Sequence, residues 1–177
     1  MVALSTVLAL AAAVGTYQLL ADDGEDQVVG ASISLSPEET VSPGDASFTT
    51  FDGEVVPLTS IYGTPTVVNF FASTCTPCVT EMPAFEAVHQ DLGDTVAFLG
   101  LAVADRPEDA QALVQRTGVT YDTAQDKDQT VISALGGLGL PTTVLLGADG
   151  QVVAKHTGAL TADALRGLIA EHLGAPG

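Results

Sequence analysis

Two patterns of apolar residues recur from residue 64 onwards, one typical of buried strands and the other of helices. Residues 66–73 (TVVNFFAS) and 96–104 (VAFLGLAVA) are nearly continuous apolar runs of strand length. Continuous rather than alternating runs predict strands that are buried on both faces. Residues 75–93 instead place apolar side chains three or four positions apart, which predicts a helix with one buried face. The first half of the domain therefore reads as strand, turn, helix, strand.

The remaining elements follow from the same patterns and from turn residues. Residues 48–63 hold two short extended runs around Asp52-Gly53, a strong tight-turn signal. After the second long strand, the pattern predicts an amphipathic helix over 107–118 and a shorter helix over 128–136. A hairpin over 142–158, with its turn at 148–150, follows. The last element is an amphipathic helix over 161–174, with Thr161 as N-cap. The order β, α, β, α, β, β, α predicts an α/β layer structure with a mixed sheet.

The N-terminal region has a different character. Residues 1–20 contain no charged side chain, and as a helix they would span roughly 30 Å, the thickness of a hydrocarbon core. We therefore expect residues 1–21 to be a membrane anchor or a signal segment. Residues 22–46 carry seven acids and no Lys or Arg, which predicts an acidic flexible linker. The organisation is then anchor or signal, linker, and one domain over 47–177, attached to the cell membrane by a single pass or secreted if residues 1–21 are cleaved.

Charge narrows the classes of partner. The 177 residues include 22 Asp and Glu against 5 Lys and Arg, for a formal net charge of −17. A nucleic-acid binder neutralises phosphates with clustered basic side chains, and the five basic residues here are scattered along the chain. Nucleic acid is therefore excluded as a partner.

The only two cysteines, Cys75 and Cys78, stand where the first long strand meets the first helix. A zinc site needs about four ligands, and the three histidines, His89, His156 and His172, have no metal-ligand spacing to complete one. A passive disulfide here would close a minimal loop and stabilise little. A helix N-terminus stabilises a thiolate, and Cys78 lies one turn further on the same side. The pair is predicted to be a redox dithiol, with metal binding as the alternative.

The segment around the cysteines, VVNFFASTCTPCVTEMPAFEAV, resembles the active-site segment of the thioredoxin superfamily, in its membrane-tethered TlpA/ResA-like branch. The resemblance continues at 48–68 and 139–169 and covers about residues 47–174. It implies a thioredoxin fold, with a mixed central sheet flanked by helices and an N-terminal β extension. Phe71 and Thr74 depart from the family pattern, which usually has Trp at these positions.

The resemblance also implies roles for individual residues. Cys75 would be the exposed nucleophile and Cys78 the more buried resolving thiol. Glu81 would lie near the thiols and handle protons or tune their pKa, since Asn69 replaces the buried acid of cytosolic thioredoxins; the alternative is a solvated helix Glu.

A second implied set of residues contacts the substrate. The Leu140-Pro141 bond would be cis and face the cysteines, whereas an X-Pro bond in general is cis only about 5–6% of the time. The residues expected to bind substrate are Thr76, Pro77, Leu140 and Pro141.

The sequence therefore predicts an extracytoplasmic thiol:disulfide oxidoreductase that uses Cys75 and Cys78 and needs no cofactor or metal. Its expected task is to reduce disulfides in exported proteins, apocytochromes c included, with a membrane redox partner as electron source. The alternatives are a disulfide-forming oxidant of the same fold and, from another class, a copper- or zinc-binding module. A peroxiredoxin is disfavoured, because the motif is Cys-x-x-Cys rather than a lone peroxidatic Cys.

Overall fold

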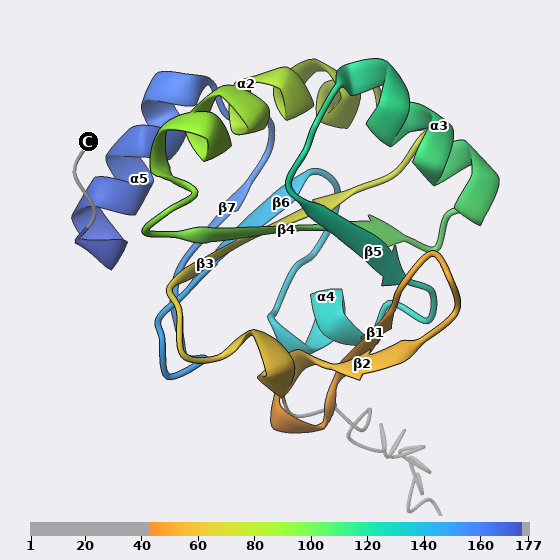
Figure 1. Cartoon of the computed structure of the whole chain (residues 1–177), viewed down its shortest axis with the longest axis horizontal. Helices are drawn as coiled ribbons and strands as arrows, with labels where there is room; N and C mark the ends of the chain where they lie inside the picture. Colours follow the sequence, from red (N-terminus) through yellow and green to blue (C-terminus); the bar gives the residue numbers. More distant parts are fainter. Residues whose placement is uncertain (1–42, 175–177) are drawn as a thin grey trace, which may run out of the picture. The chain divides into compact units, whose positions relative to one another are not determined.

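A seven-stranded mixed sheet in the order β2-β1-β5-β4-β3-β6-β7 organises the domain (Figure 1). The structure, a computed structural model, describes residues 43–174. The strands are β1 (Ser47–Thr49), β2 (Val55–Pro57), β3 (Thr66–Phe71), β4 (Ala97–Val103), β5 (Asp122–Asp126), β6 (Thr142–Leu146) and β7 (Val152–Thr157). The helices are the 3-10 turns η1 (Pro43–Asp45) and η2 (Leu58–Ile61), and α2 (Thr76–Leu92), α3 (Pro107–Thr117), α4 (Thr130–Ala134) and α5 (Ala162–Leu173).

The strands β3, β4 and β5 are parallel, so their carboxyl ends meet at one edge of the sheet. On one side of these strands, β6 pairs antiparallel to β3, and the β6-β7 hairpin forms that edge. On the other side, β1 pairs antiparallel to β5, and the β1-β2 hairpin forms that edge. This arrangement confirms the expected thioredoxin-like α/β fold with a mixed sheet. The expected anchor or signal segment 1–21 lies outside the described residues, and within 43–174 no helix is long and apolar enough to cross a membrane.

Helices cover both faces of the sheet, which explains the continuous apolar run of β3. All six residues of β3 are buried. Val67 and Phe71 belong to the core cluster that includes residues of α2, α3 and α5, whereas Val68 and Phe70 belong to the cluster that includes residues of α4. In Figure 1, α2, α3 and α5 lie over one face and α4 lies below the other. The strand that carries the chain to the cysteines is therefore held from both sides.

One strand, β5, was not predicted from the sequence. Its residues, DTAQD, contain no apolar run and no alternation, and Asp is depleted in strands. It forms because β4 pairs with it along one side, where five residue pairs run from Leu99↔Asp122 to Val103↔Asp126, and β1 pairs with it on the other. Tertiary pairing overrides the local preference here.

The turn and cap residues behave as their types predict. Gly53 has φ 92°, and its N–H donates to Thr50 O at 3.0 Å in the β1-β2 hairpin. Gly118, with φ 72°, ends α3 in the left-handed conformation. Thr161 Oγ1 accepts from Ala164 N at 3.2 Å and so caps α5, as expected.

The packing of α2 on the sheet gives a stability prediction. Phe85 on α2 is fully buried in the core cluster shared with α3 and α5. Phe85→Ala is expected to lower the free energy of unfolding by about 3–5 kcal/mol, because the apolar surface is lost and a cavity remains. Urea unfolding of the oxidised protein measures this loss, with the exposed helix position Ala87→Ser as control. An unfolding curve for Phe85→Ala that overlays the control curve would contradict the assigned packing.

Candidate active site

The site begins where β3 ends. After Phe71 the chain turns through residues 72–74, and Cys75 becomes the N-cap of α2. Cys75 N donates to Ala72 O at 3.1 Å, which closes the turn. Pro77 lies in the first turn of the helix, where a backbone N–H has no intrahelical partner to lose. Strand, turn and helix therefore present Cys75 at the carboxyl edge of the sheet.

The two cysteines form a disulfide, and their surroundings differ. Cys78 is fully buried, whereas Cys75 is partly exposed. Cys78 N donates to Cys75 Sγ at 3.3 Å, so an N–H group of the first helical turn points at the outer sulfur. Such a group, together with the helix dipole, stabilises a thiolate once the disulfide is reduced. Cys75 is thus the more accessible of the two sulfurs, and Thr76 and Pro77 beside it are exposed.

Glu81 is buried one helical turn beyond Cys78, with 2% of its surface exposed. Asn69 Nδ2 on β3 donates to Glu81 Oε1 at 2.8 Å, and Leu160 N before α5 donates to Glu81 Oε2 at 3.0 Å. Burial raises the pKa of the Glu81 carboxyl, and the two hydrogen bonds only partly oppose that rise. The alternative of a solvated helix Glu is therefore wrong.

Asn69 can serve both protonation states of Glu81. As placed, its amide Nδ2 donates to the carboxylate, while its Oδ1 makes no hydrogen bond among the described residues. A rotated amide would present Oδ1 as an acceptor for a protonated carboxyl. An amide on β3 and a carboxyl on α2 thus lie side by side.

The Leu140-Pro141 bond is cis, as the resemblance implies. The antiparallel register pairs Phe70 of β3 with Thr142 of β6, so the next pair places Pro141 opposite Phe71. Pro141 therefore lies beside the point where β3 delivers the chain to the cysteines. Leu140 is half-buried and packs against the same apolar cluster as Cys75.

Sequence reasoning missed one contact at this edge. Asp105, which follows β4, accepts hydrogen bonds from Ser73 N at 2.5 Å and from Ser73 Oγ at 2.8 Å. Neither residue belongs to a recognisable motif. The available signal was positional, because residues that follow neighbouring parallel strands meet at the same edge.

The histidines take no part in this arrangement. The ring of His89 packs edge-on against Phe98 and Tyr121, with centroids 5.3 and 5.7 Å away. His156 lies on β7 and His172 near the end of α5. Within residues 43–174 no group of three or more His, Cys, Asp or Glu side chains is placed to hold a metal ion.

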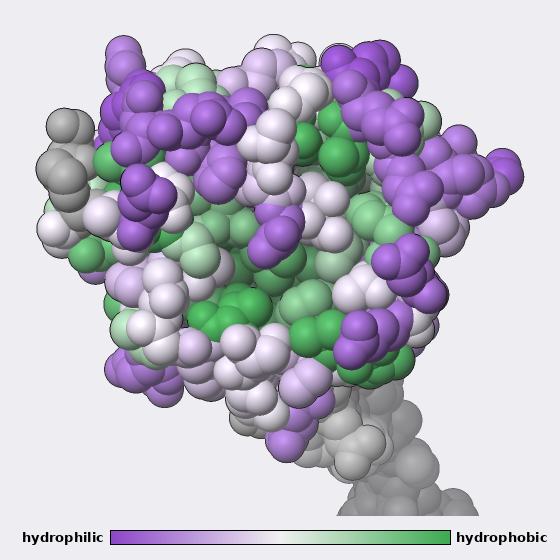
Figure 2. Space-filling model, in the orientation of Figure 1, coloured by the Kyte–Doolittle hydropathy of each residue, from purple (hydrophilic) through white to green (hydrophobic). Residues whose placement is uncertain are grey.

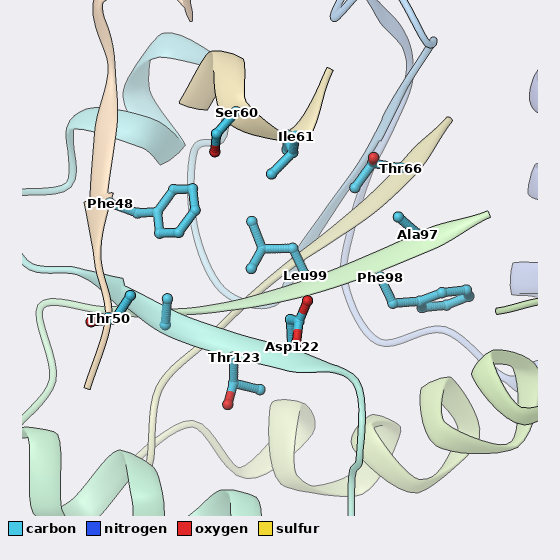
Figure 3. Close-up of a pocket in the computed structure, with 11 residues that line it drawn as sticks. Phe48, Thr50, Ser60, Ile61, Thr66, Ala97, Phe98, Leu99, Asp122 and Thr123 are labelled. Carbon is cyan, nitrogen blue, oxygen red and sulfur yellow. The ribbon is translucent and has the colours of Figure 1, made fainter. Parts of the chain in front are cut away.

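A cavity of about 330 Å³ lies at the other end of the parallel strands. Figure 3 shows its walls, which include Thr66 at the start of β3, Leu99 near the start of β4 and Asp122 at the start of β5. Figure 2, in the orientation of Figure 1, shows a face with hydrophobic surface near its middle and hydrophilic side chains around it. Because Cys75 follows the carboxyl end of β3, the cavity and the cysteine pair are separate.

A thioredoxin-type sheet with a Cys-x-x-Cys disulfide at the strand-helix junction defines the class of thioredoxin-like thiol:disulfide oxidoreductases. The AhpC/TSA family matches residues 42–155, more than half of the sequence, and the chain belongs to this family.

Individual relatives agree with this class. The protein named thiol-disulfide oxidoreductase ResA from Halalkalibacterium halodurans is 33% identical over 111 residues, which are 62% of this chain and 63% of that protein. The ResA of Geobacillus thermodenitrificans is 28% identical over 90% of this chain and 88% of its own length. Among solved structures, a thiol:disulfide interchange protein of the thioredoxin family from Chlorobium tepidum matches with a TM-score of 0.63 and 26% identity. That match covers 76% of this chain and 96% of the other.

The raised pKa of Glu81 predicts how stability depends on pH. A carboxyl whose pKa is higher in the folded state favours folding most below its ordinary value of 4.5. The free energy of unfolding should fall as pH rises from there through the raised pKa, by up to about 1.4 kcal/mol per pH unit. Glu81→Gln removes this titration, so the variant should lack the part of the fall that Glu81 contributes.

Urea unfolding of the oxidised protein from pH 4 upward measures the difference. Glu54→Gln, which removes an exposed carboxyl in the β1-β2 hairpin, serves as control and should follow the unmodified protein. Parallel stability curves for Glu81→Gln and the unmodified protein would show that Glu81 is not desolvated.

Proposed function

We propose that this protein is an extracytoplasmic thiol:disulfide oxidoreductase that reduces disulfides in exported proteins, apocytochromes c included. The carrying observation is the asymmetric cysteine pair, in which Cys75 is accessible at the N-terminus of α2 and Cys78 is buried behind it. This asymmetry suits two successive exchange steps with two different sulfur nucleophiles.

The proposed reaction starts from the reduced pair. The Cys75 thiolate attacks one sulfur of a partner disulfide, forms a mixed disulfide and releases the other partner sulfur as a thiolate. Cys78 then loses its proton and attacks Cys75 Sγ, which breaks the mixed disulfide. The partner leaves with two thiols, and the chain is left with the Cys75–Cys78 disulfide seen in the structure. A membrane dithiol donor must then supply two electrons and two protons to restore the pair.

Glu81 is proposed to take the Cys78 proton, because it is a buried carboxyl one helical turn beyond that thiol. A carboxyl with a raised pKa exchanges protons closer to neutral pH than an exposed one. Asn69 can form a hydrogen bond with either the ionised or the protonated carboxyl of Glu81, so Glu81 keeps this partner when it gains or loses a proton. This role explains why a costly buried carboxyl lies one turn from the resolving thiol.

The partner is proposed to bind along the sheet edge formed by the cysteine turn and the start of β6. Thr76 and Pro77 are exposed next to Cys75, and Leu140-Pro141 adjoins the end of β3. An extended segment on either side of a partner's disulfide can contact both. The net charge of −17 disfavours strongly acidic partners.

Two observations support the oxidoreductase chemistry and the location. Relatives that align over much of the chain carry the name thiol-disulfide oxidoreductase ResA. The uncharged stretch 1–20 supports a membrane-attached or exported protein. An oxidising compartment is compatible with a reductant when electrons are supplied from the membrane.

The alternatives have less support. A disulfide-forming oxidant would use the same residues in the reverse direction and differs in its reduction potential alone. A copper- or zinc-binding module would need further ligands near the cysteines, and the described residues offer no such cluster. Disulfide exchange is favoured over peroxide reduction, because Cys78 is already placed to resolve a bond at Cys75.

Single cysteine substitutions test the order of the steps. With an oxidised synthetic peptide that carries the Cys-x-x-Cys-His haem-attachment sequence, and dithiothreitol as electron source, the unmodified protein should release peptide thiols catalytically. Cys78→Ser should lose turnover. Once it has been reduced, freed of dithiothreitol and mixed with the oxidised peptide, it should accumulate a mixed disulfide between Cys75 and the peptide, which non-reducing mass spectrometry detects. Cys75→Ser is the matched control and should show neither turnover nor adduct. Turnover by Cys75→Ser would refute the mechanism.

A further inference from the structure

One carboxylate from the end of β4 holds the turn that presents Cys75. Asp105 Oδ2 accepts from Ser73 N at 2.5 Å, and Asp105 Oδ1 accepts from Ser73 Oγ at 2.8 Å. Because both oxygens of one carboxylate accept from the same residue, these bonds fix the orientation of Ser73 as well as its position. Ser73 precedes Cys75 by two residues and belongs to the turn between β3 and α2.

The backbone aims Asp105 at this turn. Ala104, which directly follows β4, has φ 47°, in the left-handed region that non-glycine residues rarely adopt. Its N–H donates to Asp126 O at 3.1 Å, which ties the bend to the end of β5. Arg106 N donates to Asp105 Oδ1 at 2.9 Å and fixes the carboxylate from its own side. An unfavourable conformation held by two neighbouring bonds indicates a position with a specific task.

The turn needs such an external support, because its internal bonds are few. Cys75 N donates to Ala72 O, and Cys78 N donates to Cys75 Sγ at 3.3 Å. The second contact is the one that stabilises a thiolate, and it depends on where the turn places Sγ relative to the first turn of α2.

We propose that Asp105 is a positioning residue that acts through Ser73 to hold Cys75 Sγ against the N-terminus of α2. This inference rests on the proposed function, since it assigns the clamp to the reactivity of the nucleophile. The charged groups that follow the turn most closely along the adjoining elements are Asp105 and Arg106, directly after β4, and Glu81, the first charged residue of α2.

Charge and position make opposite predictions, which allows a clean test. If Asp105 acted through its negative charge alone, its removal would lower the pKa of the Cys75 thiol, and Ser73 substitutions would have no effect. If Asp105 acts as a clamp, loss of either partner loosens Sγ from the helix N-terminus and raises the pKa of that thiol. Ser73→Ala separates the two cases, because it removes one clamp bond and keeps the carboxylate.

The experiment measures the rate of Cys75 alkylation by iodoacetamide against pH in the reduced full-length protein. Ser73→Ala and Asp105→Asn should each shift the midpoint upward, by up to about one pH unit for Asp105→Asn, so that alkylation below the midpoint slows up to about tenfold. Ser73→Thr, which keeps the hydroxyl and the N–H, should restore the original midpoint. Asp109→Asn, an exposed carboxylate in the first turn of α3, should leave it unchanged.

Unchanged midpoints in both Ser73→Ala and Asp105→Asn, or a downward shift in Asp105→Asn with no shift in Ser73→Ala, would overturn the clamp. The proposed function fails separately, if the unmodified protein itself shows a Cys75 midpoint at or above the ordinary value of about 8.5. Thermal unfolding of each oxidised variant verifies that a changed midpoint comes from a folded protein.

Discussion

The buried carboxyl of Glu81 is the constraint to which the rest of the site is fitted. A carboxylate removed from water is costly unless its oxygens accept hydrogen bonds, and here each oxygen receives one. The donors come from β3 and from the segment before α5, so one side chain of α2 is joined to two distant elements. This fixes the first turns of α2 over the sheet and thereby fixes Cys78, one turn earlier.

The turn that precedes Cys75 is held by a different set of contacts at the same edge. The parallel strands β3 and β4 end side by side, and the residues that follow them, Ser73 and Asp105, meet there. The antiparallel pairing of β6 brings Pro141 beside the end of β3. Ser73, Asp105 and Pro141 thus lie at one edge of the sheet because of strand order, although they are far apart in the sequence.

Much of this could be predicted from the sequence, because the responsible signals are local. The continuous apolar runs of β3 and β4, the helical spacing of α2 and the Cys-x-x-Cys at their junction depend on neighbouring residues only. The strand β5 could not be predicted, since its polar residues form a strand only through β4 and β1. The partners of Glu81 and Asp105 were equally out of reach. Leu160 contributes a backbone N–H, which carries no sequence signal, and Ser73 is an ordinary small polar residue in a turn.

The equilibrium reduction potential of the Cys75–Cys78 pair tests the central claim most directly. It can be measured by titration of the protein against dithiothreitol or glutathione buffers, with the oxidised fraction followed by thiol labelling. A dedicated reductant is expected to have a value near or below that of thioredoxin, about −270 mV. A value towards about −120 mV would mark a disulfide donor and would contradict the proposed reduction of exported proteins and apocytochromes c.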